Sequence, residues 1–572
     1  MWPNAYPSTL FVASLALGLI VSTVSSSQEK QKSPTPVDVK EALTKTTLLD
    51  CVRVLNKKPG WCELRGASIS KIFPKPMSPE IKMVSGPNSV IAAWNGAAFD
   101  PVDLKMYFHG GGHRDYGGNE VYELDLLRGK WSRLTDPAYI PPPTKEVRCP
   151  VPVSGPPSSH TYDGFIFARS TRTIFMIPSV YGCVRGSLNP DREMWEFNPS
   201  KTETRNSLAP LTWRQRDLMP EKMKWKYYRT AEFEDGRLYV SNGVFESIYN
   251  VKENSWKRIG SRPNYGAGTS IYDPKRKGIW SVHRHGLVFT KPPKIGRLLS
   301  KSGAGVDGFS GIARTRDDKL IFWNGASYIH TYDPETQEWR LFDWAGKGPK
   351  IGSRVYSKWV WLPRYDVYVG YADAKSSAWV YRHPISEKGK PVNTSSIQPL
   401  LKKAKPGETV KIPPGIYQAG AIINKSLKLD MKDVRIIGPT HGKGVLLIKN
   451  AKGPVIIENF RTFDPIRCGN CAGIKIEGKN FNVTVRKSHI SNAEMGILTD
   501  NWGGALIVED TLIEDIGHAR GQEPMHLIYA GIIDKLRVVR STLRRSHYYG
   551  HIVKSRAVHT EISDTYISGG IG

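Results

Sequence analysis

Short runs in which hydrophobic and polar residues alternate fill most of the chain between residues 85 and 384. The stretches 104–134, 236–259 and 318–342 share one plan: a strand that ends in glycine, a strand with tyrosine, a turn with Asp or Asn, and a strand with tryptophan. Alternation with a period of two residues, interrupted by turn residues, predicts short antiparallel strands. A four-stranded unit of this kind cannot bury both faces alone, so we expect the units to pack radially as a β-propeller.

The repeat predicts six propeller blades. They begin near Ser89, His160, Tyr228, Gly266, Phe309 and Arg354. Residues 50–85 could supply a seventh blade. The Gly–Tyr–Trp spacing over about residues 85–384 resembles the kelch family, also called galactose-oxidase-like propellers. The Cys–Tyr cofactor and the Tyr and His ligands of that family's copper oxidase cannot be placed in this sequence, so we do not expect an oxidase.

A second pattern, rich in Ile, Val and Gly, begins near residue 396. Four segments align, and a short strand precedes each of them. The segments are 483–494, 506–517, 536–547 and 559–570, and the short strands are 473–476, 496–499, 526–529 and 551–554. Repeats of strands and turns without helices predict the coils of a parallel β-helix. The opening GETVKIPPGIYQAG (407–420) and the stacked Gly-Ile strands resemble the pectate-lyase-like right-handed β-helix family.

The chain is therefore expected to be all-β, with a propeller over 85–384, a linker over 385–395 and a β-helix over 396–572. Tryptophan supports this division, because all but two of the 16 Trp residues lie between Trp61 and Trp379. The last repeat stops at Gly572 without a visible cap, which predicts either a truncated β-helix or an end covered by another body.

The amino terminus has the pattern of a secretory signal. Leu10 to Val21 is an uninterrupted apolar run, and small residues follow it as far as Ser27. The run is too short to span a bilayer, so we expect a signal peptide over 1–27 and a leader segment over 28–84 that runs into the propeller. A secreted or periplasmic protein that is not transmembrane follows; an uncleaved anchor is the alternative.

Six cysteines in an exported chain predict disulfide bonds rather than a metal or redox site. Proximity in the sequence suggests three pairs, although other pairings stay open. The pairs are Cys51/Cys62, Cys149/Cys183 and Cys468/Cys471.

The charge balance changes which partners are expected. The 81 Lys and Arg residues exceed the 53 Asp and Glu residues, which gives a formal net charge of +28. An acidic glycan, a nucleic acid or an anionic surface would suit such a field. No nucleic-acid-binding signature is present, and a signal peptide also argues against nucleic acid. Both parts of the chain are basic, so the net charge does not locate a site.

The densest set of reactive side chains lies between residues 526 and 556. If the coils align, His526 stacks beside His551 and Tyr529 beside Lys554, where the earlier coils have Gly473, Gly496, Ile476 and Thr499. Further candidates are Arg556 as a catalytic residue and, for substrate binding, Arg544, Arg545, Tyr548 and Tyr549. The alternative is a solvated basic face.

This combination suits β-elimination in an acidic polysaccharide. The reaction needs a cation on the substrate carboxylate, a base for the α-proton and an acid for the leaving oxygen. We assign His551 or Lys554 as the base, Arg556 to the carboxylate, and Tyr529 or His526 as the acid. The resemblance to the pectate-lyase-like fold implies the same activity class, because its lyases and uronate epimerases use Lys/Arg or His/Arg pairs.

A second candidate cluster lies in the propeller, around the glycine-rich stretch 109–120. Propeller-type polysaccharide lyases use His, Tyr and Arg, so these residue types could form a substrate site here. The candidates are His109, His113, Tyr116, His160, Tyr228 and Arg229. A glycine-rich blade turn with hydrogen-bonded histidines explains the same residues and is the favoured interpretation.

The sequence thus predicts a secreted protein that acts on an acidic polysaccharide, as a lyase or a uronate epimerase. The alternative is a non-catalytic glycan-binding or surface-adhesion protein, and a hydrolase would need a carboxylate pair that the cluster lacks. No cofactor is required, and calcium binding stays open. The acids that could hold calcium are Glu494, Asp500, Glu509, Asp510, Glu514 and Asp515.

Overall fold

The computed structural model describes residues 46–569 with short gaps. The gaps are 67, 113, 180, 184–185, 189–192, 221–226, 262–265, 284, 302–305, 345–347, 350–353, 385–388, 437–442, 463–470, 492, 502, 518–524 and 547–549. The expected signal peptide, His113, Tyr548, Tyr549, Cys468 and the side chain of Cys183 therefore lie outside the described residues. Among the helices of the described ranges, none has the length and apolar character needed to cross a bilayer.

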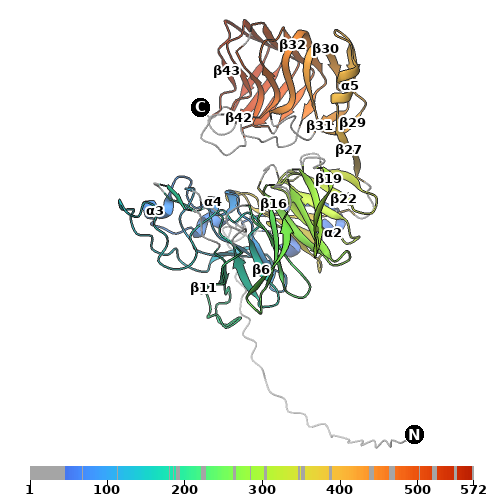
Figure 1. The fold of residues 1–572 in the computed structure, drawn as a ribbon. Coiled ribbons are helices and arrows are strands. Elements are labelled where there is room, and N and C mark those ends of the chain that lie inside the picture. The colour runs from blue at the N-terminus through green and yellow to red at the C-terminus, as the bar shows by residue number, and fades with distance from the viewer. Residues whose placement is uncertain are drawn as a thin grey trace, which may run out of the picture. The chain divides into compact units, whose positions relative to one another are not determined.

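The first part is a six-bladed β-propeller of four-stranded antiparallel sheets, which confirms the predicted fold class (Figure 1). Blade one consists of β2 (Ala98–Asp100), β3 (Lys105–Phe108), β4 (Tyr122–Asp125) and β5 (Lys130–Arg133). Blade two consists of β6 (Phe165–Ala168), β7 (Thr173–Met176), β10 (Trp195–Phe197) and β11 (Trp213–Gln215). Blade three consists of β12 (Arg229–Glu232), β13 (Leu238–Ser241), β14 (Phe245–Asn250) and β15 (Ser255–Ser261). Blade four consists of β16 (Gly268–Asp273), β17 (Gly278–His283), β18 (Gly286–Lys291) and β19 (Lys294–Lys301). Blade five consists of β20 (Gly311–Arg314), β21 (Leu320–Trp323), β22 (Tyr328–Asp333) and β23 (Glu338–Asp343). Blade six consists of β24 (Trp359–Leu362), β25 (Val367–Gly370), β26 (Ala378–Arg382) and β1 (Gly60–Leu64). A separate hairpin, β8 (Tyr181–Cys183) and β9 (Gly186–Leu188), follows β7.

The ring is closed by an amino-terminal strand. β1 pairs with β26 as the outermost strand of blade six, so residues 50–85 complete that blade and form no seventh one. Helix α2 (Leu48–Lys57) precedes β1; it begins with a capping box in which Thr47 Oγ1 accepts from the N–H of Asp50 at 3.2 Å. The other helices before blade one are short: η1 (Ile69–Ile72), α3 (Pro79–Lys82) and α4 (Ser89–Ala92).

A disulfide bond fixes this closure. Cys51 of α2 and Cys62 of β1 are bonded, as the sequence predicted. Cys149 and Cys471 are also disulfide-bonded, and none of the cysteines that the structure describes is free.

Removing the Cys51–Cys62 bond is expected to destabilise the propeller. The bond spans 11 residues, and loss of a cross-link of that size costs about 3 kcal/mol of unfolding free energy. The double variant Cys51→Ser/Cys62→Ser should therefore unfold at lower urea concentration than the wild type. A loss below about 1 kcal/mol would contradict a closing role for this bond.

The second part is a parallel β-helix whose strands pair across successive coils (orange to red in Figure 1). Its elements are β27 (Lys390–Ser396), α5 (Gln398–Lys403), β28 (Thr409–Lys411), β29 (Gly415–Ala419), β30 (Ala421–Asp430), β31 (Val434–Ile436), β32 (Gly444–Glu458), β33 (Arg461–Thr462), β34 (Ala472–Glu477), β35 (Val483–Arg486), β36 (His489–Ser491), β37 (Met495–Thr499), β38 (Ala505–Glu509), β39 (Leu512–Ile516), β40 (Ile528–Ala530), β41 (Lys535–Val539), β42 (Thr542–Ser546), β43 (Val553–Ser555), β44 (His559–Ser563) and β45 (Tyr566–Ser568). Within the segment expected to be a linker, β27 pairs antiparallel with β23 and parallel with β29.

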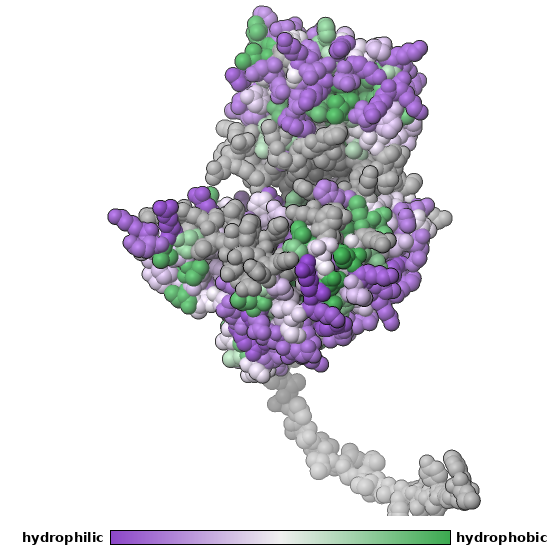
Figure 2. Space-filling view, in the orientation of Figure 1, coloured by the Kyte–Doolittle hydropathy of each residue, from purple (hydrophilic) through white to green (hydrophobic). Residues whose placement is uncertain are grey.

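Branched aliphatic side chains build the β-helix core. Val485, Val508 and Val538 occupy equivalent positions in successive coils and are fully buried. Ile562, the next member of this column, is 41% exposed. Hydrophilic side chains dominate the face of the molecule shown in Figure 2, with smaller hydrophobic areas between them, as the high positive charge predicts.

Candidate functional site

The sequence-predicted column of reactive side chains exists on the last two coils of the β-helix. The rings of His526 and His551 stack with centroids 5.1 Å apart and an interplanar angle of 15°. Tyr529 pairs with Lys554, whose Nζ lies 4.6 Å from the centre of the Tyr529 ring. Both predicted neighbour relations are confirmed, because strands of adjacent coils place equivalent residues side by side. We call His526, Tyr529, His551, Lys554 and Arg556 the basic column.

The alignment with the earlier coils differs by one residue from the predicted one. Tyr529 pairs with Leu498, and Leu498 pairs with Lys475, so Ile476 and Thr499 are not in this column. In the earlier coils, Ala472 pairs with Met495, and continuing the observed pairing of β37 with β40 puts Met495 opposite His526. Gly473 and Gly496 are therefore not in the His526 column. Side-chain direction alternates along a strand, and a shift of one residue exchanges inward and outward positions. The corrected register puts apolar Leu498 beside Tyr529.

The members of the basic column differ in exposure and charge. His526 is 1% exposed, and its Nδ1 accepts a hydrogen bond from the backbone N–H of His551 at 3.0 Å. Burial, with a smaller contribution from the nearby Lys554, lowers the pKa of His526 to about 4. His526 is therefore a neutral imidazole with its proton on Nε2 near neutral pH, whereas the side chains of His551 and Arg556 are exposed.

Two cations of the column have no carboxylate partner within the ranges that the structure describes. Neither Lys554 nor Arg556 forms an ion pair with any residue that the structure describes. Other cations of the same coils are neutralised. Arg537 binds Glu561 at 3.1 Å, and Arg540 binds Asp510 at 2.8 Å. Surface cations that are left unpaired next to paired ones mark a place where an external anion can bind.

Two predicted substrate-binding arginines are located elsewhere. Arg544 and Arg545 lie on β42, in a different sheet from β40 and β43, rather than in a loop beside the histidines. Arg544 pairs with Glu514 at 2.7 Å, and Arg545 pairs with Asp515 at 2.8 Å. These contacts also engage two of the six acids that were candidates for calcium, Glu514 and Asp515. Among the described residues, no group of three or more potential ligand side chains converges on a metal position.

Most of the predicted propeller residues are core residues. His109 is fully buried and its Nδ1 lies 3.3 Å from the carbonyl oxygen of Glu120; Tyr116 donates to the Glu120 carboxylate at 2.5 Å. Tyr228 and Arg229 are also buried. The structure therefore places His109, Tyr116, Tyr228 and Arg229 in the packed interior of the propeller.

His160 belongs to a different group, where the chain enters the innermost strands of blades one, two, three and six. Its Nε2 lies 3.2 Å from a carboxylate oxygen of Asp115, and its ring lies 4.8 Å from that of Trp94. Aromatic contacts extend the group on both sides. We call this group the channel-mouth cluster; it comprises Trp94, Asp115, His160, Tyr162, Tyr227, Arg354 and Tyr356. Only His160 was predicted, because the other members are scattered through the sequence without a motif.

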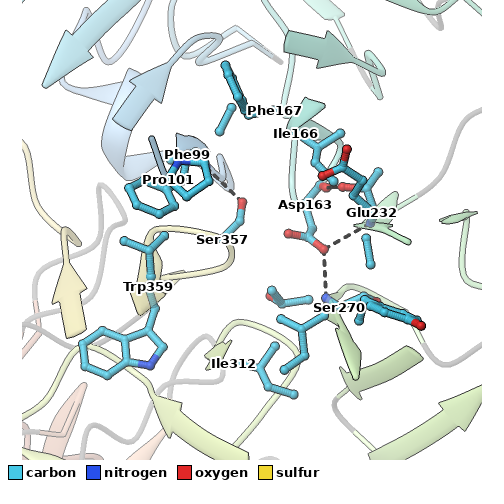
Figure 3. A pocket seen from close by; sticks show the side chains of 18 of the residues that line it. Phe99, Pro101, Asp163, Ile166, Phe167, Glu232, Ser270, Ile312, Ser357 and Trp359 are labelled. Carbon is cyan, nitrogen blue, oxygen red and sulfur yellow. Dashed lines mark hydrogen bonds between the residues drawn. The ribbon is translucent and has the colours of Figure 1, made fainter. Parts of the chain in front are cut away.

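A cavity of about 440 Å³ lies in the propeller channel, between the innermost strands of all six blades (Figure 3). Phe99, Phe167, Ile312 and Trp359 line it with apolar side chains. The carboxylate of Asp163 projects into this cavity and accepts hydrogen bonds from the N–H groups of Thr230, at 3.2 Å, and Ser270, at 2.9 Å. Asp163 therefore ties blade two to blades three and four.

No protein-family model matches the sequence, and no curated protein matches it. Solved structures that are similar over about half of the chain include a streptogramin B lyase (12% identity, 54% of this chain and 87% of that chain, TM-score 0.30) and YjhT (13% identity, 54% and 95%, TM-score 0.32). A third is an auxiliary nutrient binding protein from Bacteroides ovatus ATCC 8483 (7% identity, 53% and 75%, TM-score 0.34). Similarity at this level carries no information about function, and the fold assignment rests on the strand pairing described above.

Proposed function

We propose that this protein is exported and cleaves an acidic polysaccharide by β-elimination at the basic column of the β-helix. The observation that carries the proposal is the pair of cations, Lys554 and Arg556, that have no ion-pair partner among the described residues while proton-transfer groups lie beside them. A uronate polymer supplies the missing carboxylates. The partly exposed Tyr529 ring offers an apolar face next to Lys554 on which a sugar ring can lie.

The reaction assigns one task to each group. Arg556 binds the uronate carboxylate, which makes the neighbouring C5 proton more acidic. His551 or Lys554 removes that proton, the C4–O bond breaks, and a C4=C5 double bond forms. Tyr529 gives a proton to the leaving oxygen. His526 is too buried for the acid role that the sequence allowed; as a neutral acceptor for the His551 N–H, it positions that residue.

The test is incubation of the full chain with pectate, alginate, ulvan-type polymers and glycosaminoglycans, followed by ultraviolet absorbance of the unsaturated uronate product. A rise with one of these polymers is the expected result. A uronate epimerase would give no absorbance but would exchange the C5 proton with deuterated solvent. Retention on an acidic-glycan gel without either signal would replace the lyase proposal with the glycan-binding alternative.

A further inference from the structure

The channel-mouth cluster combines a cation, aromatic faces and a His–carboxylate pair within one contact network. The Arg354 guanidinium lies 3.3 Å from the centre of a Trp94 ring. The Tyr162 ring lies 5.0 Å from that of Tyr227 and 5.9 Å from that of Tyr356. The His160 ring lies 5.9 Å from that of Tyr162. These residues come from four blades, and the innermost strands of those blades begin directly after them.

The backbone of the cluster is strained. Trp94, Tyr162, Arg354 and Tyr356 all have positive φ values, of 44°, 49°, 60° and 49°. Most of the other non-glycine residues with positive φ that the structure describes are Asn, Asp, Lys or Arg. Bulky residues rarely adopt this conformation, and strained residues persist where the surrounding structure holds them, often at functional sites. Four large side chains with the same strain in one cluster indicate that their positions are selected for something other than stability.

A buried lysine holds two of the strained segments in place. Lys358 is fully buried, and its Nζ donates to the carbonyl oxygen of Arg354 at 2.8 Å and to that of Asn95. These bonds tie the residue after Trp94 to the residue that carries the guanidinium. The stacked geometry of Arg354 on Trp94 is therefore fixed before any ligand arrives, which reduces the entropy lost on binding.

The cluster contains a cation with no ion pair among the described residues and a buried hydroxyl with no hydrogen-bond partner among them. Arg354 forms no ion pair with a described residue, although Asp115 and Glu494 are among the charges that act on it; burial, the largest influence, lowers its pKa. The hydroxyl of Tyr356 is fully buried and has no hydrogen-bond partner among the described residues. A buried hydroxyl without a partner costs free energy.

We propose that the channel-mouth cluster is a second, separate binding site, for a sugar ring that carries a carboxylate. The guanidinium of Arg354, held by the Trp94 face, pairs with the carboxylate. Tyr227, which is 40% exposed, supplies a face for the ring. The Asp115 carboxylate, whose side chain is 25% exposed, accepts hydrogen bonds from sugar hydroxyls. This site does not depend on the basic column, and it can bind without any reaction taking place there.

The proposal is tested in a full-length Lys554→Ala/Arg556→Ala background, which removes the anion site of the basic column. Isothermal titration with a galacturonate hexasaccharide should show binding, and the methyl-esterified form of the same hexasaccharide should bind at least tenfold more weakly. Adding Arg354→Asn should lower the affinity for the acid at least tenfold with no fall in Tm, because asparagine tolerates positive φ. Tyr227→Ala, at an exposed position, should weaken binding in the same assay.

The matched control is Arg258→Asn. Arg258 also lies over an aromatic ring, that of Phe245 at 5.0 Å, but on the outer strand of blade three. This control should keep the full affinity. Three outcomes would each overturn the proposal. They are equal affinity for the acid and its ester, unchanged binding in both Arg354→Asn and Tyr227→Ala, and no binding in the Lys554→Ala/Arg556→Ala background. None of these outcomes affects the elimination assay, so the two proposals fail separately.

Discussion

Asp163→Ala is expected to destabilise the propeller by about 2–5 kcal/mol, because it leaves buried backbone donors without acceptors. One carboxylate oxygen of Asp163 accepts from the N–H groups of both Thr230 and Ser270. These donors belong to the innermost strands of blades three and four. Neither N–H group has another acceptor among the described contacts.

The matched variant is Asp163→Asn, which keeps an acceptor oxygen for both N–H groups. Burial raises the pKa of Asp163 from 3.8 to about 8, and the hydrogen bonds to its carboxylate only partly oppose this effect. The folded state therefore holds a proton that the unfolded state releases between pH 4 and pH 8, and wild-type stability falls as pH rises through that interval. Asparagine does not titrate, so Asp163→Asn should remove this contribution and be more stable than the wild type above pH 8.

Urea denaturation at several pH values, followed by tryptophan fluorescence, measures both effects. The expected order at pH 9 is Asp163→Asn, then wild type, then Asp163→Ala. Equal pH profiles for wild type and Asp163→Asn would show that Asp163 is ionised in the folded protein, and a stable Asp163→Ala would show that the blades do not need this junction.

The repeat architecture could be predicted because each blade carries its own signal. Glycine after one strand, tyrosine in the next and tryptophan in the last are set by local turn chemistry and by packing within one sheet. The closure by β1 could not be predicted in this way. That strand pairs with β26, more than 300 residues later, and Gly60 to Leu64 carry no feature that names their partner.

The candidate functional residues also divide into those that a sequence repeat predicts and those that only distant parts of the chain bring together. His526/His551 and Tyr529/Lys554 were predictable because neighbouring coils repeat in sequence, so that adjacent segments can be aligned directly. The register toward Leu498 was missed by one residue, since the intervening loops differ in length and only the observed pairing fixes the offset. The channel-mouth cluster has no repeat: Trp94, Tyr162 and Arg354 meet only because the propeller ring closes, and their positive φ values cannot be read from residue type.

Lys554→Ala is expected to lower kcat for β-elimination by about 10²–10⁴-fold if Lys554 is the base, the range that positioned proton transfer contributes. His551→Ala would then mainly raise KM. A fall in kcat for His551→Ala with mainly a higher KM for Lys554→Ala would assign the base to His551. In that case the stacking of the His551 ring on His526 would position the base. Arg556→Ala should raise KM in either case, because its proposed task is to bind the carboxylate.

The matched control for these variants is Arg537→Ala, which removes a cation that already has a carboxylate partner, Glu561. Arg537 on β41 and Lys554 on β43 belong to successive coils of the same β-helix. A general loss of positive charge or of coil stability would therefore affect both variants alike. Loss of turnover in Lys554→Ala with full turnover in Arg537→Ala would therefore show that the reaction needs the unpaired cation. Equal losses would reduce the basic column to a charged surface, because the chemistry of an elimination depends on where the proton goes and not on the net charge around it.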